Sequence, residues 1–364
     1  MSEVLAEIKG AVGCITLQRP KALNALSLSM IRSLTSALLA WRDDPAVQAV
    51  VLRGSNKEGP FGALCAGGDI RFFHQAILAG DPSLEDFFTE EYQLNHLIFN
   101  YPKPYIALMD GLVMGGGMGI SQGATLRVVT ERTRMAMPET QIGLFPDVAG
   151  GYFLSRCPGR MGEYLGLTGA HLNAHQALTA RLADGWLRSE DLPGLWDRLC
   201  DGSLQTSEGI RTWMAEQLRP AMEAPQGHED VFSPDIDAIF GLPTVIDMVQ
   251  ALKASNSAWA VRVLDMLLKR SPLMLHVTLE QIRRARALTL AEVLRMERDM
   301  VRQCFHWRPG TASETMEGIR ALVIDKDQNP HWQPAQLEEV TPEMVQAFFE
   351  SPWPAYAHPL RHLT

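Results

Sequence analysis

Residues 105–119 read YIALMDGLVMGGGMG, and this stretch decides the fold. The apolar run Tyr105 to Met109 predicts a buried strand, and a turn at Asp110-Gly111 leads into three consecutive glycines, Gly115 to Gly117. Glycine is a poor helix former that loses much backbone entropy on folding, so the cluster indicates that the backbone closely approaches either a ligand or a packed neighbour. The stretch lacks the acidic partner about 20 residues downstream that a dinucleotide site needs, and it lacks the Gly-Lys-Ser/Thr of a phosphate loop.

Strands and helices alternate on both sides of this stretch. Upstream, residues 4–8 and 12–17 predict a β-hairpin, Ser27 predicts the cap of a helix that runs to Trp41, and Val47 to Leu52 predicts a short strand. A Gly-rich loop through Asp69 and a helix from Leu84 to Phe99 complete the upstream half, and strands are expected downstream at 126–130 and around Met135. Alternation of this kind is typical of an α/β layered domain that binds ligands at the turns between its elements.

Helical patterns dominate beyond residue 190. Apolar residues recur at helical spacing in residues 258–269, 272–288 and 291–304, while the polar, Pro- and Gly-containing residues 220–234 predict a loop between helices. The sequence therefore predicts an α/β region at residues 1–190 and a helical region at residues 191–364 that packs on it.

The composition argues against several classes of protein. The chain has 42 acidic and 33 basic residues, a formal charge of −9, and no Lys/Arg-rich block, which argues against an electrostatic surface for nucleic acid. It has no run of about 18 apolar residues that could span a membrane. The start, MSEVLAEIKG, lacks the apolar block of a signal peptide and the Arg/Ser bias of a transit peptide, so a cytoplasmic protein is expected. Five scattered cysteines without a CxxC pair predict neither a disulfide framework nor a metal site, and His171 and His175 lack a third ligand.

A second glycine turn lies at residues 65–70, Cys65-Ala66-Gly67-Gly68-Asp69-Ile70. Taken alone, it is an ordinary tight turn. Together with Gly115 to Gly117 it gives two turns that can each present a free N–H, and one such donor to a developing oxyanion can be worth about 3 kcal/mol. Cys65 could be considered a nucleophile, but no base stands beside it, so we interpret it as a small packing residue.

Three carboxylates stand out because their neighbours are apolar. Glu139 and Asp147 lie in the segment AMPETQIGLFPDV (136–148), and Glu91 falls in the apolar stripe of the helix predicted at 84–99. Acids in such surroundings are candidates for buried groups with tuned ionisation. For Asp147 the structural alternative is the cap of a helix that begins near Val148.

These segments resemble the crotonase (enoyl-CoA hydratase/isomerase) superfamily, and the resemblance runs through nearly the whole chain. Members of this superfamily bind acyl-CoA thioesters and stabilise an oxyanion with two backbone N–H groups. The resemblance implies an α/β fold, a crotonase-like layered β-β-α core with a helical C-terminal half. It places the two donors at Gly68 and Gly116, and it places Glu139 at a catalytic position.

One branch of the superfamily matches better than the others. The strings EEYQLN (90–95), MGGG (114–117), MPE (137–139), GLFPDV (143–148) and EGIRALVIDKD (317–327) are similar to those of the branch that hydrolyses 3-hydroxyisobutyryl-CoA in valine breakdown. This similarity implies that Glu91, Gly116, Glu139 and Asp147 contact substrate. Hydratases carry a second glutamate where this chain has Gly119, and commonly a glycine where it has Asp147. An enoyl-CoA hydratase or isomerase is the alternative activity, and a non-catalytic acyl-CoA binding protein is a minor one.

The resemblance also implies where coenzyme A binds. It places two segments around the adenine and pantetheine, with the residues Lys21, Ala22 and Leu23 and the residues Ala66, Gly68, Asp69, Ile70 and Arg71. The structural alternative for these segments is a loop and a helix start. No metal or redox cofactor is expected, since coenzyme A is part of the substrate. Neither nucleic acid nor a membrane is expected as a partner. The resemblance implies a possible homo-oligomer, and the alternative is that the helical half covers the surface through which members of the superfamily associate.

Overall fold

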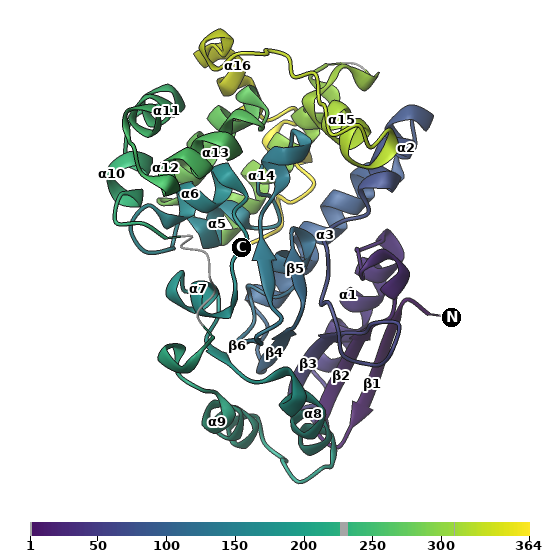
Figure 1. The fold of residues 1–364 in the computed structure, drawn as a ribbon. Coiled ribbons are helices and arrows are strands. Elements are labelled where there is room, and N and C mark those ends of the chain that lie inside the picture. The colour runs from purple at the N-terminus through teal and green to yellow at the C-terminus, as the bar shows by residue number, and fades with distance from the viewer. Residues whose placement is uncertain (1, 226–231, 309) are drawn as a thin grey trace. The chain divides into compact units, whose positions relative to one another are not determined.

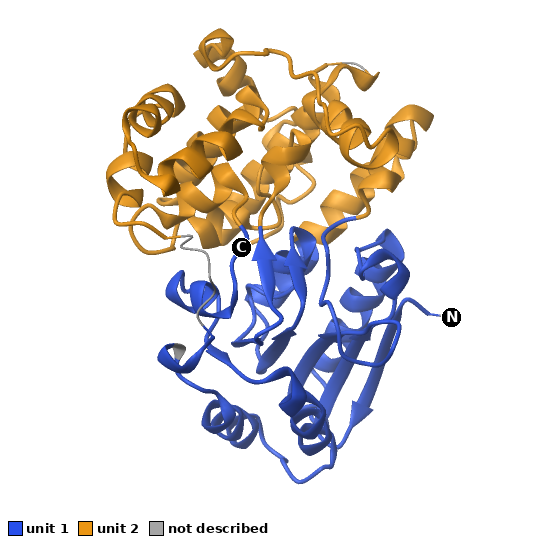
Figure 2. Cartoon of the chain, viewed as in Figure 1, with its two compact units in different colours: residues 1–68, 93–136, 171–229 blue, residues 69–92, 137–170, 230–364 orange. Residues whose placement is uncertain are grey.

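The structure is a computed structural model that describes residues 2–225, 232–308 and 310–364 (Figure 1). Of the loop expected at 220–234, residues 226–231 lie outside the described part. The chain forms two compact units, each assembled from separate segments (Figure 2). The first unit comprises residues 1–68, 93–136 and 171–229, and the second comprises residues 69–92, 137–170 and 230–364. These units therefore differ in composition from the expected regions 1–190 and 191–364.

The first unit is built on a six-stranded sheet. In spatial order its strands are β1 (Val4–Lys9), β2 (Val12–Leu17), β3 (Ala49–Gly54), β4 (Tyr105–Met109), β6 (Leu126–Val129) and β8 (Gly185–Trp186). The expected hairpin is confirmed, because β1 and β2 pair antiparallel with Val4 opposite Leu17. All other pairs are parallel. Parallel pairs need crossover connections, and helix α1 (Leu28–Arg42), capped by Ser27 as predicted, supplies the one between β2 and β3.

Helices cover this sheet and complete its core. The remaining elements of the first unit are a two-stranded parallel sheet of β5 (Leu112–Met114) and β7 (Arg134–Ala136), the helices α4 (Gly116–Gly119), α7 (Ala174–Thr179), α8 (Leu192–Cys200) and α9 (Ser207–Gln217), and the 3₁₀ turns Pro20–Ala22, Ser189–Asp191 and Ala221–Glu223. Residues of α8 and α9 share one buried cluster with the inner faces of β2, β3 and β4. Residues beyond 190 thus contribute to the core of the sheet, which explains why the unit extends to residue 229.

The second unit is helical in its described residues. Its helices are α2 (Ile70–Ala79), α5 (Gly150–Leu154), α6 (Met161–Thr168), α10 (Ile236–Phe240), α11 (Val245–Ala254), α12 (Ala258–Leu268), α13 (Pro272–Ala285), α14 (Leu290–His306), α15 (Glu314–Ile319) and α16 (Pro342–Gln346), with a π-helical turn at Arg320–Ile324 and 3₁₀ turns at Glu139–Ile142, Gly310–Ala312, Leu337–Glu339, Ala347–Phe349 and Ala355–Ala357. Helix α3 (Ser83–Phe99), predicted at 84–99, contributes residues to both units. The sequence determines where the long helices begin: Ser271 caps α13 ahead of Pro272, and Thr289 and Glu292 form a capping box on α14.

Candidate active site

The two glycine turns lie side by side in the first unit. The N–H of Cys65 donates to the Leu112 carbonyl, and the N–H of Met114 donates to the Cys65 carbonyl, both at 3.0 Å. Cys65 therefore pairs with β5 as a parallel strand would. This pairing brings the turn that contains Gly68 next to the turn that contains Gly116.

Three glycines shape these turns for identifiable reasons. Gly67 has φ +113° and Gly115 has φ +48°, conformations that residues with a Cβ rarely adopt, and each immediately precedes one of the expected donors. A Cβ on Gly117 would lie 2.4 Å from the Cys65 carbonyl oxygen, so this glycine is needed for close packing rather than for a ligand. In the described residues neither the Gly68 N–H nor the Gly116 N–H has a backbone acceptor, as expected for Gly116 at the first position of α4.

Four of the buried carboxyl groups in the second unit have no cationic partner among the described residues. Glu91, Glu139, Asp147 and Glu297 are all at most 6% exposed. In the described part of the chain none of them forms an ion pair with Lys, Arg or His. One oxygen of Glu91 (Oε1) and one of Glu139 (Oε2) have no hydrogen-bond partner there either. Buried polar atoms without partners are costly, so these two oxygens are available to a bound molecule.

Burial raises the pKa of all four acids, and neighbouring carboxylates raise it further in Glu91, Glu139 and Glu297. Burial is the first cause for each group, and the charge of Asp147 is a further cause for Glu91, Glu139 and Glu297. The pKa of Glu91 and that of Glu139 are raised well above the usual value. The pKa of Asp147 rises to about 6, although a hydrogen bond of 2.8 Å from the Tyr92 hydroxyl opposes the effect of burial. The cluster therefore holds protons at neutral pH, because buried carboxyl groups without a cation resist ionisation.

A clamp made by Glu297 and Gln281 holds the turn that carries Asp147. Glu297 Oε2 accepts the Ala149 N–H and its Oε1 accepts the Gly151 N–H, each at 2.8 Å. The amide of Gln281 donates to the Pro146 carbonyl at 2.7 Å and to Glu297 Oε1 at 2.9 Å.

Within this clamped turn, Val148 (φ +52°) and Ala149 (φ +69°) occupy left-handed conformations that cost energy for residues with a side chain. The clamp offsets this strain. Helix α5 begins after the turn with Ala149 as its N-cap and without a side-chain cap bond, so Asp147 does not cap that helix.

The sequence reasoning missed Tyr92, Gln281 and Glu297. The signal for Glu297 was present in the stripe at 291–304: the residue lies at helical spacing with Val293, Leu294, Met300 and Val301, all buried. The same criterion, an acid inside an apolar stripe, had selected Glu91. Nothing local in the sequence marks Gln281, because its role depends on contacts with residues more than 130 positions away.

The residues expected to bind coenzyme A lie in two adjoining segments. The Ala66 N–H donates to the Leu23 carbonyl at 3.0 Å, so the turn of Lys21, Ala22 and Leu23 contacts the start of the glycine turn within the first unit. In the second unit, Asp69 caps α2 by accepting the Phe72 N–H. Lys21 and Arg71 are exposed. Their positive charges are accessible to an anionic ligand.

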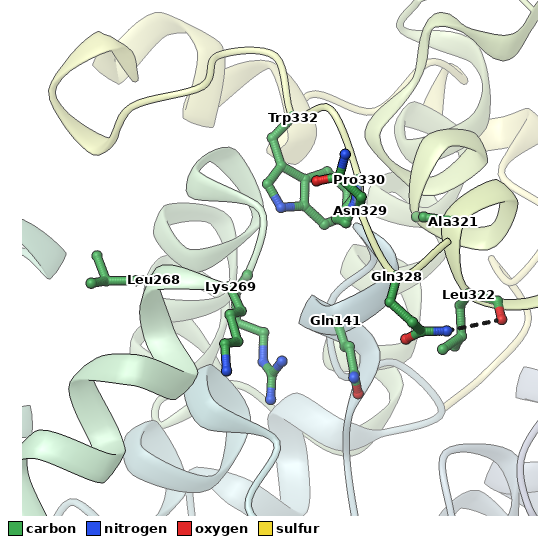
Figure 3. A pocket seen from close by; sticks show the side chains of 11 residues that line it. Gln141, Leu268, Lys269, Ala321, Leu322, Gln328, Asn329, Pro330 and Trp332 are labelled. Carbon is green, nitrogen blue, oxygen red and sulfur yellow. Dashed lines mark hydrogen bonds between the residues drawn. The ribbon is translucent and has the colours of Figure 1, made fainter. Parts of the chain in front are cut away.

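A separate pocket of about 460 Å³ lies in the second unit (Figure 3). Its lining residues include Lys269, Trp332 and Gln141, and Gln141 comes from the same 3₁₀ turn as Glu139. None of the four buried acids lines this pocket. No group of His, Cys, Asp or Glu side chains in the described ranges is arranged to hold a metal ion. Among the described helices, none combines the length and the apolar character needed to cross a membrane.

Comparisons with known proteins agree with this geometry. The model of the family described as enoyl-CoA hydratase/isomerase matches residues 12–349. Proteins named "3-hydroxyisobutyryl-CoA hydrolase, mitochondrial" from Xenopus tropicalis and Homo sapiens are 40% and 39% identical to this chain, and each alignment covers 96% of this chain and 89% of the relative.

Two solved structures have the same fold. A carnitinyl-CoA dehydratase from Mycobacterium thermoresistibile superposes with a TM-score of 0.85 at 36% identity over 96% of this chain and 97% of its own. An enoyl-CoA hydratase from Rhodobacter sphaeroides 2.4.1 gives the same TM-score and identity over 96% of this chain and 98% of its own. The expected crotonase-like fold is thereby confirmed, and the chain belongs to the enoyl-CoA hydratase/isomerase family.

Proposed function

We propose that the protein hydrolyses a short-chain 3-hydroxyacyl-CoA thioester, with 3-hydroxyisobutyryl-CoA as the first candidate. The observation that carries this proposal is the composition of the acid cluster. Glu139 and Asp147 are both buried, and burial together with the charge of Asp147 raises the pKa of Glu139, while position 119, where a hydratase of this family has its second glutamate, is a glycine. The names of the relatives that are about 40% identical support the same substrate.

The proposed reaction begins with polarisation of the thioester carbonyl. The N–H groups of Gly68 and Gly116 donate to the carbonyl oxygen and stabilise the negative charge that develops on it. Their preceding glycines, Gly67 and Gly115, fix the direction in which these N–H groups point. The carbonyl carbon becomes more electrophilic as a result.

Glu139 then acts on that carbon by one of two routes. Its carboxylate either attacks the carbon to form a mixed anhydride that water cleaves, or removes a proton from a water molecule that attacks instead. A carboxylate whose pKa is raised is a stronger base and nucleophile once it is ionised, and Glu139 has an oxygen without a partner in the described chain. Both routes end in the free acid and the coenzyme A thiol.

Asp147 and Glu91 have supporting roles in this proposal. Asp147 orients the 3-hydroxyl group or the water and gives a proton to the departing thiolate, a role that suits a carboxyl with a pKa of about 6. Glu91 keeps its proton because it is buried beside Asp147 and Glu139, so its hydroxyl can donate a hydrogen bond to the substrate.

The test is thiol release from a panel of acyl-CoA thioesters. Free thiol should appear with 3-hydroxyisobutyryl-CoA, and crotonyl-CoA should be neither hydrated nor cleaved at a comparable rate. Hydration of crotonyl-CoA without thiol release from any hydroxyacyl-CoA would show that the protein is a hydratase. Binding of acyl-CoA with no turnover of either substrate would show that it is a binding protein.

A variant separates the role of Glu139 from that of the fold. Glu139→Gln keeps the shape of the side chain but removes the base or nucleophile, so kcat should fall by about 100-fold or more. Unchanged thioester cleavage in this variant would show that another group does the chemistry. We further propose that the protein is located in the cytoplasm, which cell fractionation tests. We also propose that it needs no metal or redox cofactor, and thioester cleavage should therefore persist after dialysis against a chelator.

A further inference from the structure

Two cysteines of the first unit lie next to each other although they are 186 residues apart in sequence. The Sγ atoms of Cys14, on β2, and Cys200, the last residue of α8, are 3.0 Å apart. A disulfide bond is about 2.05 Å long, so the two sulfurs need to approach by only about 1 Å to become bonded. Both residues are free thiols in this structure.

The surrounding core holds the two elements in this arrangement. Helix α8 packs against the sheet through Leu195, Trp196 and Leu199, which belong to the same buried cluster as Val12 and Cys14 (Figure 1). Because the backbones of β2 and α8 are fixed by this packing, the two thiols meet without any movement of whole elements. The proximity is a property of the folded core.

The two thiols differ in exposure. Cys14 is 2% exposed, whereas Cys200, at the end of its helix, is partly exposed. Of the two residues, Cys200 is therefore the one more open to a soluble oxidant. Cys14 is placed to react only with its neighbour.

Positive charge near the pair favours ionisation of Cys200. The guanidinium of Arg53 is held 3.5 Å from the Trp196 ring and donates to Thr16, and Lys9 extends from β1. The S–H of Cys14, Lys9 and Arg53 together lower the pKa of Cys200, while burial and the charge of Asp197 oppose this. The same hydrogen bond and burial raise the pKa of Cys14, so Cys14 keeps its proton. This is the usual environment of a reactive thiol with a neighbour that resolves its oxidised form.

We propose that Cys14 and Cys200 are a redox-active pair that hydrogen peroxide or an organic hydroperoxide converts into a disulfide. The Cys200 thiolate attacks one peroxide oxygen, the O–O bond breaks, and Cys200 becomes a sulfenic acid while hydroxide or alkoxide leaves and takes up a proton. Cys14 Sγ then attacks Cys200 Sγ, and the sulfenic hydroxyl leaves with the proton of Cys14 as water. In total two thiols are oxidised, one hydroperoxide is reduced, and two molecules of water, or one water and one alcohol, are formed. A dithiol reductant reverses the reaction by exchange.

The test uses the full-length protein and counts its thiols. The reduced wild type has five cysteines, and after treatment with hydrogen peroxide three should remain reactive once the chain is unfolded. Peptide mapping without reduction should find the segments of Cys14 and Cys200 linked, and dithiothreitol should restore five thiols. A triple variant, Cys65→Ser, Cys157→Ser and Cys304→Ser, should lose both of its remaining thiols in the same way.

Single variants assign the roles of the two sulfurs. Cys200→Ser should lose no thiol pair, and Cys14→Ser should accumulate a sulfenic acid at Cys200 that dimedone traps. Cys200 lies at a half-exposed helix end, so Cys200→Ser remains informative even if Cys14→Ser does not fold. The proposal is overturned if the peroxide-treated wild type keeps five thiols, if the lost thiols map to other cysteines, or if Cys200→Ser still forms a disulfide that contains Cys14.

Discussion

Replacing Glu297 with glutamine tests whether the clamp around the Asp147 turn holds a buried acid. The wild-type carboxyl accepts three hydrogen bonds, from Ala149, Gly151 and Gln281. In the variant, the glutamine oxygen can still accept the hydrogen bonds from Gly151 and Gln281, but the glutamine NH₂ group would then face the Ala149 N–H. One hydrogen bond is lost and two donors confront each other, which should cost about 1–3 kcal/mol.

A second effect opposes this cost and depends on pH. Burial raises the pKa of Glu297 from 4.5 to about 8, so the folded protein holds a proton that the unfolded chain releases between these values. The raised pKa therefore lowers the free energy of unfolding as pH rises through this window, by about 5 kcal/mol in total. Glutamine carries no such proton. Relative to wild type, the variant should be less stable by about 1–3 kcal/mol near pH 5. The stability difference should then change by about 4 kcal/mol up to pH 8, so the variant should be the more stable protein there.

Urea unfolding of both proteins at several pH values between 5 and 8 measures this difference. Glu91, Glu139 and Asp147 titrate in both proteins, so their contributions cancel to first order. Glu280→Gln is the matched control, because Glu280 forms a half-exposed ion pair with Arg284 that is worth about 0–1 kcal/mol. A stability difference for Glu297→Gln that stays constant with pH would refute the view that Glu297 holds a proton in the fold.

The remaining predictions concern the turns and the pH profile. Gly117→Ala should be destabilised by about 1–3 kcal/mol, measured by urea unfolding, because its Cβ would meet the Cys65 carbonyl at 2.4 Å; wild-type stability would contradict the packing. Tyr92→Phe removes a hydrogen bond that lowers the pKa of Asp147, so the apparent pKa in the pH dependence of kcat/KM should rise by about 1–2 units. An unchanged pH dependence would show that ionisation of Asp147 does not control the rate. In wild type the free energy of unfolding should fall as pH rises from about 4 to 6, because the raised pKa of Asp147 lets the folded chain keep a proton that the unfolded chain releases. Asp147→Asn removes this proton, so its free energy of unfolding should fall less over the same range. An equal dependence on pH in calorimetry would contradict this.

Local signals in the sequence singled out the candidate site residues, whereas the division of the chain into units depends on contacts between distant residues. Glycine clusters and acids among apolar residues are local signals, and they were sufficient to select both glycine turns, Glu91, Glu139 and Asp147. The helix at 84–99 and the hairpin at 4–17 were predicted for the same reason, since capping and periodicity are local.

Features that depend on long-range contacts were not predicted. The pairing of Cys65 with β5 joins residues nearly 50 positions apart, and the packing of α8 on the sheet assigns residues beyond 190 to the first unit. No local pattern encodes either contact. The clamp of Gln281 and Glu297 on the 146–151 turn is of the same kind, and it explains how Val148 and Ala149 can hold left-handed conformations that their own preferences disfavour.

The acid cluster raises the question of which group holds the proton when the reaction starts. Without substrate, the Tyr92 hydrogen bond favours the ionised form of Asp147, and its charge favours the protonated form of Glu139. The proposed reaction needs the opposite arrangement, with Glu139 ionised and the proton on Asp147. Both arrangements carry one proton on the pair and differ only in which carboxyl group holds it. The form with Glu139 ionised and Asp147 protonated is therefore a minor form in equilibrium with the major one. Tyr92→Phe favours that minor form because it weakens the ionised state of Asp147. An increase in kcat/KM near neutral pH in this variant would support Glu139 as the attacking group, whereas a decrease would indicate that Asp147 is the base and Glu139 the acid.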